Sequence, residues 1–265
     1  MWGKGQVRYH STDSVDANEL INKYNIERQF SRKTKNISEL KQILPTLDIN
    51  KIALTQTIQP ADMSAFGVIF NGQHYTSNCM TRYGEYPFCT QMVLPSYSTA
   101  KSIFAGLAMF YLEQNFPSVF KEKVSDWLPQ CNQERWQGVT FSHLLNMNTG
   151  NFESIAHSAD ETAEHSQLFF KAKTHQEKMK YACQQFSRKS QPGKTFVYHT
   201  SDTYLLGSAL NNFLKAQLSK NEKTTDTSVF EYVFINKLWP LIKLSPVAYS
   251  TRRTADSQHQ AFTGY

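Results

Sequence analysis

The spacing of apolar residues divides the chain into many short elements. Between residues 20 and 44, apolar positions recur three or four residues apart, which predicts two short amphipathic helices. Residues 64–76 hold two strand-like runs around Asn71-Gly72, a dipeptide favoured in two-residue hairpin turns. We therefore predict a pair of antiparallel strands that follows the N-terminal helices.

The most continuous apolar stretch covers residues 103–112, which include no charged side chain. A helix without a polar stripe is typical of a protein interior, so this pattern predicts a buried helix. The sequence predicts further helices at 139–150, with Gly150 as the cap, at 168–186, after the turn at Pro192-Gly193, and at 230–244.

These patterns suggest two parts. Residues 1–60 are predicted to form a helical lead-in, and residues 61–265 the main domain. The whole chain, with 265 residues, is long enough for one large core or two modest lobes.

Composition narrows the class of protein. Apolar residues make up 40% of the chain and charged residues 19%, which is typical of a folded protein. The net charge is +6, but the basic residues are scattered without a stripe or a nucleic-acid motif, so we expect no nucleic-acid partner. No apolar run is long enough for a transmembrane segment, and the N-terminus lacks the apolar region of a signal peptide.

The four cysteines give no metal-binding pattern. Cys79 and Cys89 flank a turn-rich loop whose ends could be close enough for a disulfide. We nevertheless expect four reduced thiols, with Cys131 and Cys183 also unpaired, unless the protein is exported. The histidines between residues 151 and 190 show no metal-ligand spacing either, so no metal and no organic cofactor is predicted.

A serine three residues before a lysine can support nucleophilic catalysis. On a helix the two side chains share a face, and the amine can take the hydroxyl proton. The chain contains three such pairs, Ser38/Lys41, Ser98/Lys101 and Ser118/Lys121. The first lies in a polar-faced helix after an Asn36 cap and the third in a charged segment, so both are predicted to be solvated. Ser98/Lys101 opens the apolar helix, where burial would favour a neutral lysine.

Three ordered passages resemble a known family. They are Ser98-Thr-Ala-Lys101, Val139-Thr-Phe-Ser-His-Leu-Leu-Asn-Met-Asn-Thr-Gly150 and the passage from Pro192 to Gly207 that contains Tyr198-His-Thr200. Together they resemble the serine β-lactamase and penicillin-binding-protein superfamily, in particular its class C β-lactamase-like branch. That branch also includes D-alanyl-D-alanine carboxypeptidases, esterases and amide hydrolases.

The resemblance implies a fold and a set of roles. The expected fold is α+β, an antiparallel sheet flanked by helices with a mostly helical lobe at about 110–190. By position, Ser98 would be the acylated nucleophile, Lys101 its proton partner, and Tyr198 the base or its assistant. Asn148 and Thr200 would contact the substrate, and the Ser98 backbone N–H would be half of an oxyanion hole. Family members usually work in the periplasm or outside the cell.

The sequence departs from the family at two places. Thr200 stands where the Tyr-x-Asn element carries asparagine, which favours an ester or a non-peptide amide over a peptide as substrate. The Lys-Thr-Gly or His-x-Gly element on a closing strand is absent, so we expect an incomplete sheet and a longer parent protein. The predicted function is a serine hydrolase that cleaves a small-molecule ester or amide, or a peptide. The alternative is a catalytically inactive homologue that binds a cell-wall peptide or a protein partner.

Overall fold

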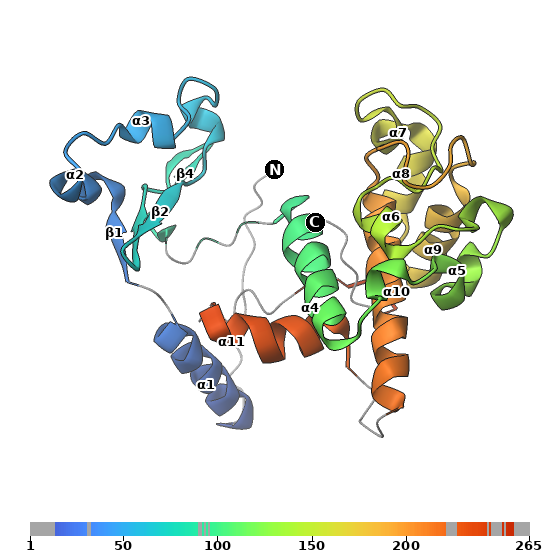
Figure 1. Ribbon diagram of the computed structural model, residues 1–265. Helices are drawn as coiled ribbons and strands as arrows, with labels where there is room; N and C mark the ends of the chain where they lie inside the picture. Colours follow the sequence, from blue (N-terminus) through green and yellow to red (C-terminus); the bar gives the residue numbers. More distant parts are fainter. Residues whose placement is uncertain are drawn as a thin grey trace, which may run out of the picture. The chain divides into compact units, whose positions relative to one another are not determined.

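The computed structural model describes residues 14–30, 33–89, 96–220, 227–242 and 253–256, together with 92, 94, 244 and 251. The chain divides into two compact units, Met1–Leu94 with Leu244–Val247 and Pro95–Lys243 with Ala248–Tyr265. Each unit is described by itself below, and Figure 1 gives the labels of the helices and strands.

The first unit contains a small mixed sheet. Strand β3 lies in the middle, paired antiparallel with β2 and parallel with β1, while β4 and β5 form a separate antiparallel pair. The strands are β1 (Thr34–Asn36), β2 (Gly67–Phe70), β3 (Gln73–Thr76), β4 (Met80–Thr81) and β5 (Gly84–Glu85). The helices are α1 (Ser14–Phe30), η1 (Ile37–Glu39), α2 (Leu40–Ile43), α3 (Ile49–Ile52) and η2 (Pro60–Asp62).

The predicted hairpin is confirmed. Strands β2 and β3 pair from Phe70 opposite Gln73 to Gly67 opposite Thr76. Asn71 and Gly72 both have positive φ, 48° and 73°, as a turn that matches the twist of the strands requires. The turn geometry is therefore consistent with this register.

The core of the first unit is small. Ile37, Leu40 and Tyr75 are buried, and partly buried apolar side chains from both the helices and the sheet pack against them. The helical turn before α2 begins at Asn36, whose side chain accepts the backbone N–H of Ser38 while Glu39 accepts the N–H of Asn36. The predicted Asn36 cap is confirmed, and Ser38 and Lys41 are exposed as expected.

The second unit is helical in its described part. One long helix, α10 (Thr200–Ser219), packs against α5, α6, α9 and η4. The elements before it are η4 (Lys101–Gly106), α4 (Leu107–Asn115), η5 (Val119–Lys121), α5 (Val124–Trp127), η6 (Pro129–Cys131), η7 (Glu134–Trp136), α6 (Phe141–Leu145), α7 (Ala159–Thr162), α8 (Glu164–Lys171) and α9 (His175–Gln184). After it come η8 (Phe230–Leu238) and α11 (Trp239–Ile242).

Helix α10 is the central helix of this unit. Every residue from Thr200 to Leu210 is buried, on all sides of the helix. Tyr204, Leu205, Leu206 and Leu210 are among the largest fully buried side chains. Because α10 begins two residues after Tyr198, its burial helps to fix the position of that segment in the unit.

The helix that follows Ser98 is less buried than the sequence predicts. It is continuous through η4 and α4, and Ala105, Ala108, Met109 and Leu112 are fully buried. However, Ile103, Leu107 and Phe110 are 43%, 43% and 61% exposed and lie along one face. The expectation that this helix is buried on all sides is therefore wrong. An apolar sequence makes burial of a helix face favourable, but it does not determine whether another element packs against that face.

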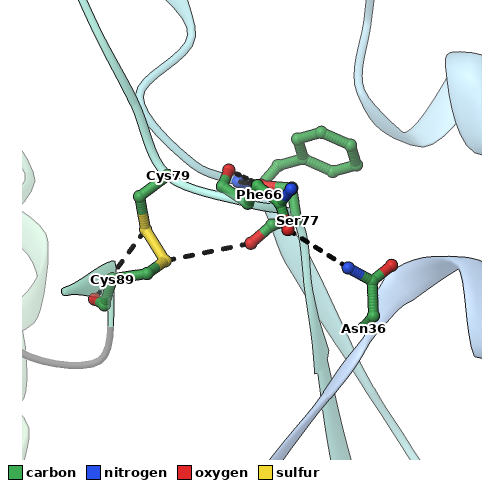
Figure 2. Close-up of a disulfide and its surroundings, with 6 residues drawn as sticks. Asn36, Phe66, Ser77, Cys79 and Cys89 are labelled. Atoms are coloured by element: carbon green, nitrogen blue, oxygen red, sulfur yellow. Dashed lines mark hydrogen bonds between the residues drawn. A yellow bond between two sulfur atoms is a disulfide. The ribbon is translucent and has the colours of Figure 1, made fainter. Parts of the chain in front are cut away.

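The expectation of four reduced thiols is also wrong. Cys79 pairs with Cys89, and Cys131 with Cys183. Figure 2 shows the first disulfide beside Ser77, whose hydroxyl accepts the backbone N–H of Phe66 at 3.0 Å. The second disulfide joins η6 to α9, positions 52 residues apart that no local pattern could pair.

Gly150 does not cap a helix. Helix α6 ends at Leu145, and Gly150 instead lies at a close crossing of two backbone segments. Its φ is +84°, and a Cβ atom there would lie 2.2 Å from the carbonyl oxygen of Ser190. The Gly150 carbonyl accepts the backbone N–H groups of Lys189 and Ser190, so glycine is required by the crossing.

The α+β class is confirmed. A small sheet and many helices make up the described residues, and the sheet is incomplete there, as expected. Among the described helices, none has the length and apolar character needed to span a membrane.

Candidate active site

Ser98 lies on a turn at the start of the helical segment. The preceding residue, Tyr97, has φ of 43°, in the left-handed region that non-glycine residues seldom adopt. The Ser98 carbonyl accepts the backbone N–H of Lys101 at 3.1 Å, which begins the helical turn. Ser98 itself is exposed.

Lys101 begins η4, a turn wound as a π-helix. π-Helical turns are rare in proteins overall, but those that occur are often found at functional sites. Only 9% of Lys101 is exposed, and its Nζ donates a hydrogen bond to Ser98 Oγ at 3.1 Å. The structure therefore agrees with two predictions: Lys101 is buried, and its side chain lies on the same side of the helical turn as Ser98.

Tyr198 reaches the same serine from a distant segment. Its hydroxyl donates to Ser98 Oγ at 2.5 Å, across 100 residues of sequence. Lys101 Nζ lies 4.9 Å from the centre of the Tyr198 ring, within the range of a cation–π contact. Serine, lysine and tyrosine thus form one cluster within the second unit.

The segment that carries Tyr198 is tied to the loop after α6. Val197 donates its backbone N–H to the carbonyl of Met147 at 2.9 Å, and Gly193 donates to that of Asn148 at 2.7 Å. These bonds hold the second and third sequence passages side by side. Met147 has φ of 49°, which turns the loop toward the Tyr198 segment.

The other two predicted site residues are not joined to this cluster. Within the described part of the chain, no hydrogen bond links Asn148 or Thr200 to Ser98, Lys101 or Tyr198. Thr200 is 4% exposed, and both its backbone N–H and its hydroxyl donate to the carboxylate of Glu161. Asn148 is half-buried, and its Oδ1 atom is buried without a hydrogen-bond partner.

A buried polar network beside the cluster is not evident from the sequence. His199 and Asp160 are each 2% exposed, and His199 Nε2 lies 3.0 Å from Asp160 Oδ2. Burial by itself lowers the pKa of His199, but the acidic side chains of Asp202 and Asp160 outweigh it and raise the pKa above its ordinary value. The one sequence signal is that His199 adjoins Tyr198, whereas nothing local points to Asp160.

The cluster has the parts for nucleophilic chemistry. An exposed hydroxyl is contacted by an amine and a phenol, either of which can exchange a proton with it. Among the described residues, no group of three or more histidine, cysteine, aspartate or glutamate side chains could hold a metal ion. The contacts of Lys101 and Tyr198 with the Ser98 hydroxyl are an arrangement that could activate a serine nucleophile.

Comparisons with known proteins place this chain in a family. A solved structure, "Putative 6-aminohexanoate-dimer hydrolase from Bacillus anthracis", matches with 15% identity and a TM-score of 0.41, over 56% of this chain and 39% of that one. The chain thus spans well under half the length of that structure. None of the curated proteins matches. The family model Beta-lactamase matches residues 73–219, a range that includes Ser98, Lys101 and Tyr198. Since this range is more than half of the chain, the protein belongs to the Beta-lactamase family, within the superfamily of serine β-lactamases and penicillin-binding proteins.

Proposed function

We propose that the protein is a serine hydrolase that cleaves an ester or amide through an acyl-enzyme on Ser98. The observation that carries this proposal is the convergence of Lys101 Nζ and the Tyr198 hydroxyl on Ser98 Oγ, at 3.1 and 2.5 Å. A serine used only as a helix cap would hydrogen-bond backbone N–H groups instead. Membership of the Beta-lactamase family supports the same reading.

In the acylation step, Ser98 Oγ attacks the substrate carbonyl carbon while its proton passes to Lys101 Nζ or the Tyr198 oxygen, whichever is in its deprotonated form. The carbonyl oxygen becomes an oxyanion, which the backbone N–H of Ser98 can stabilise. When the oxyanion collapses, the bond to the leaving alcohol or amine breaks and the leaving group receives the proton. Water then attacks the acyl carbon while the same residues take a proton from it. The bond between Ser98 Oγ and the acyl carbon breaks, the carboxylic acid leaves, and Ser98 Oγ receives the proton.

The proposed substrate class depends on Thr200, which stands where the family's Tyr-x-Asn element carries an asparagine. At Thr200 the hydroxyl is a donor to Glu161 and the side chain is buried, so it offers no paired donor and acceptor to a peptide group. This supports an ester or a non-peptide amide as substrate. It weighs against classical peptide or β-lactam side-chain recognition by this residue.

Active-site labelling tests the proposal. The full chain is treated with a fluorophosphonate probe, and the labelled peptide is identified by mass spectrometry. We expect one adduct on Ser98, its loss in Ser98→Ala, and full labelling in Ser118→Ala, which removes the serine of another Ser-x-x-Lys pair. Labelling that persists in Ser98→Ala, or an unreactive Ser98 in the unmodified chain, would reject the proposal and favour a non-catalytic homologue that binds its ligand without turnover.

A further inference from the structure

The residue after Tyr198, His199, is more deeply buried than the tyrosine itself. The ring of His199 is stacked on Phe186, with ring centres 4.2 Å apart and planes within 10°. Only 2% of His199 is exposed, whereas Tyr198 is partly exposed. His199, whose imidazole is buried and stacked, is therefore the direct chain neighbour of Tyr198, whose phenol contacts Ser98.

Asp160 is a fixed partner for this imidazole. Its Oδ2 lies 3.0 Å from His199 Nε2 and accepts the backbone N–H of Glu153, while Oδ1 accepts that of Ser154, both at 2.8 Å. The Asp160 carbonyl also accepts the Ser166 hydroxyl at 2.5 Å. A carboxylate that accepts several hydrogen bonds is held in one orientation.

Other acidic groups surround the pair. Asp202 Oδ2, on α10, is 3.7 Å from His199 Nδ1, which is too long for a hydrogen bond but close enough for charge attraction. Burial raises the pKa of Asp202, as does the charge of Glu161, and His199 opposes both. Glu161, on α7, is occupied by the N–H and hydroxyl of Thr200. Carboxyl groups on two helices thus face one imidazole, an environment that favours its protonated form.

We propose that the buried pair of His199 and Asp160 is a positioning element that holds Tyr198 against Ser98. The proposal deepens and rests on the proposed function, in which Tyr198 exchanges a proton with Ser98. The pair anchors one side of the Tyr198 peptide, and the bond from Val197 to Met147 anchors the other. Loss of the pair frees the tyrosine to move, and a displacement of about 1 Å at a reacting group can cost about 100-fold in rate.

The first test measures acylation of Ser98. The burst of p-nitrophenolate released from p-nitrophenyl acetate is followed in the full chain and in His199→Phe, which keeps the stacked ring but loses the bond to Asp160. We expect the burst rate to fall about 10- to 100-fold with little change in KM. His199→Gln retains an N–H donor and is expected to recover part of the rate.

The matched control uses the other histidine on the same aromatic ring. His165 packs edge-on against Phe186 at 5.2 Å, and among the described residues it makes no hydrogen bond or ion pair with Asp160. His165→Phe is expected to react at the unmodified rate. Equal burst rates in His199→Phe and the unmodified chain would overturn the proposal, as would equal losses in the two phenylalanine variants.

A second readout does not depend on catalysis. In protein labelled with ¹³C at the tyrosine ring carbon that bears the hydroxyl, the Tyr198 signal is assigned by its disappearance in Tyr198→Phe. We expect this signal to shift in His199→Phe and Asp160→Asn but to stay in place in His165→Phe. A Tyr198 signal unmoved by both changes would overturn the positioning role even if Ser98 is never acylated. A shifted signal without any burst would instead reject the proposed function alone.

Discussion

The Tyr198 hydroxyl lies 2.5 Å from Ser98 Oγ, although 100 residues separate the two in sequence. This contact distinguishes Ser98 from the serines of the other two Ser-x-x-Lys pairs. Ser118 has φ of 83° on an exposed turn, and Ser38 hydrogen-bonds the Asn36 cap. Because Tyr198 and Lys101 both contact Ser98, the role of each can be tested by a separate substitution.

Removal of the Tyr198 hydroxyl should slow chemistry more than binding. We expect Tyr198→Phe to lower kcat by about 100- to 10,000-fold, the usual contribution of a positioned acid or base, while KM changes little. Steady-state hydrolysis of p-nitrophenyl acetate measures both constants. Tyr86→Phe, a change on an exposed tyrosine of the first unit, should leave kcat intact. A Tyr198→Phe enzyme with normal kcat would remove tyrosine from the mechanism.

Lys101 should not be replaceable by arginine. Arginine keeps the positive charge but does not give up its proton at working pH, so it cannot pass protons to and from Ser98. Lys101→Arg and Lys101→Met should therefore both lose at least about 100-fold in the rate of Ser98 acylation. The measurement is the burst rate with the same ester. If arginine restored most of the rate, the lysine would act only through its charge.

Gly150 should be intolerant of any side chain. In Gly150→Ala, the left-handed φ costs about 1–2 kcal/mol, and the contact of Cβ with the Ser190 carbonyl adds to it. Gly138→Ala is the matched control, because Gly138 has φ of +76° but nothing within 4 Å of its Cβ position. Urea denaturation should show a larger loss of unfolding free energy for Gly150→Ala. Equal losses would mean that the backbone crossing relaxes.

Loss of the disulfides should destabilise the protein by different amounts. Cys131–Cys183 closes a separation of 52 residues and Cys79–Cys89 one of 10. The chain-entropy relation gives about 4 kcal/mol for the longer loop and about 3 kcal/mol for the shorter one. Urea denaturation of the two double-alanine variants measures this, and thiol titration of the unfolded, unreduced chain should find no free cysteine. Four titratable thiols would show that neither bond forms.

The buried histidine should make stability depend on pH. Its pKa is raised in the folded state, so folding takes up a proton, and the stabilisation is complete below the unfolded value of about 6.5. It is lost as pH rises through the raised folded pKa. The difference in unfolding free energy between the unmodified chain and His199→Gln should therefore shrink as pH increases from about 6 to about 9. A constant difference across this range would mean that His199 does not carry the charge.

Local patterns were sufficient for local structure. Asn71-Gly72 predicted the hairpin and Asn36 the helix cap, because both depend on residues a few positions apart. The three ordered passages identified the family and named Ser98, Lys101 and Tyr198 as the candidate site. Those identities require only the order of residues along the chain.

Tertiary structure decided what depends on distant partners. The sequence alone could not show that Cys131 meets Cys183, or that Asp160 lies against His199, because each pair is separated by at least 39 residues with no local signal. It also misjudged the Ser98 helix as buried all round and Gly150 as a cap, since hydropathy and residue type do not specify which segment packs alongside. The sequence of an element determines which of its faces is apolar, but only the folded chain determines which other segment packs against that face.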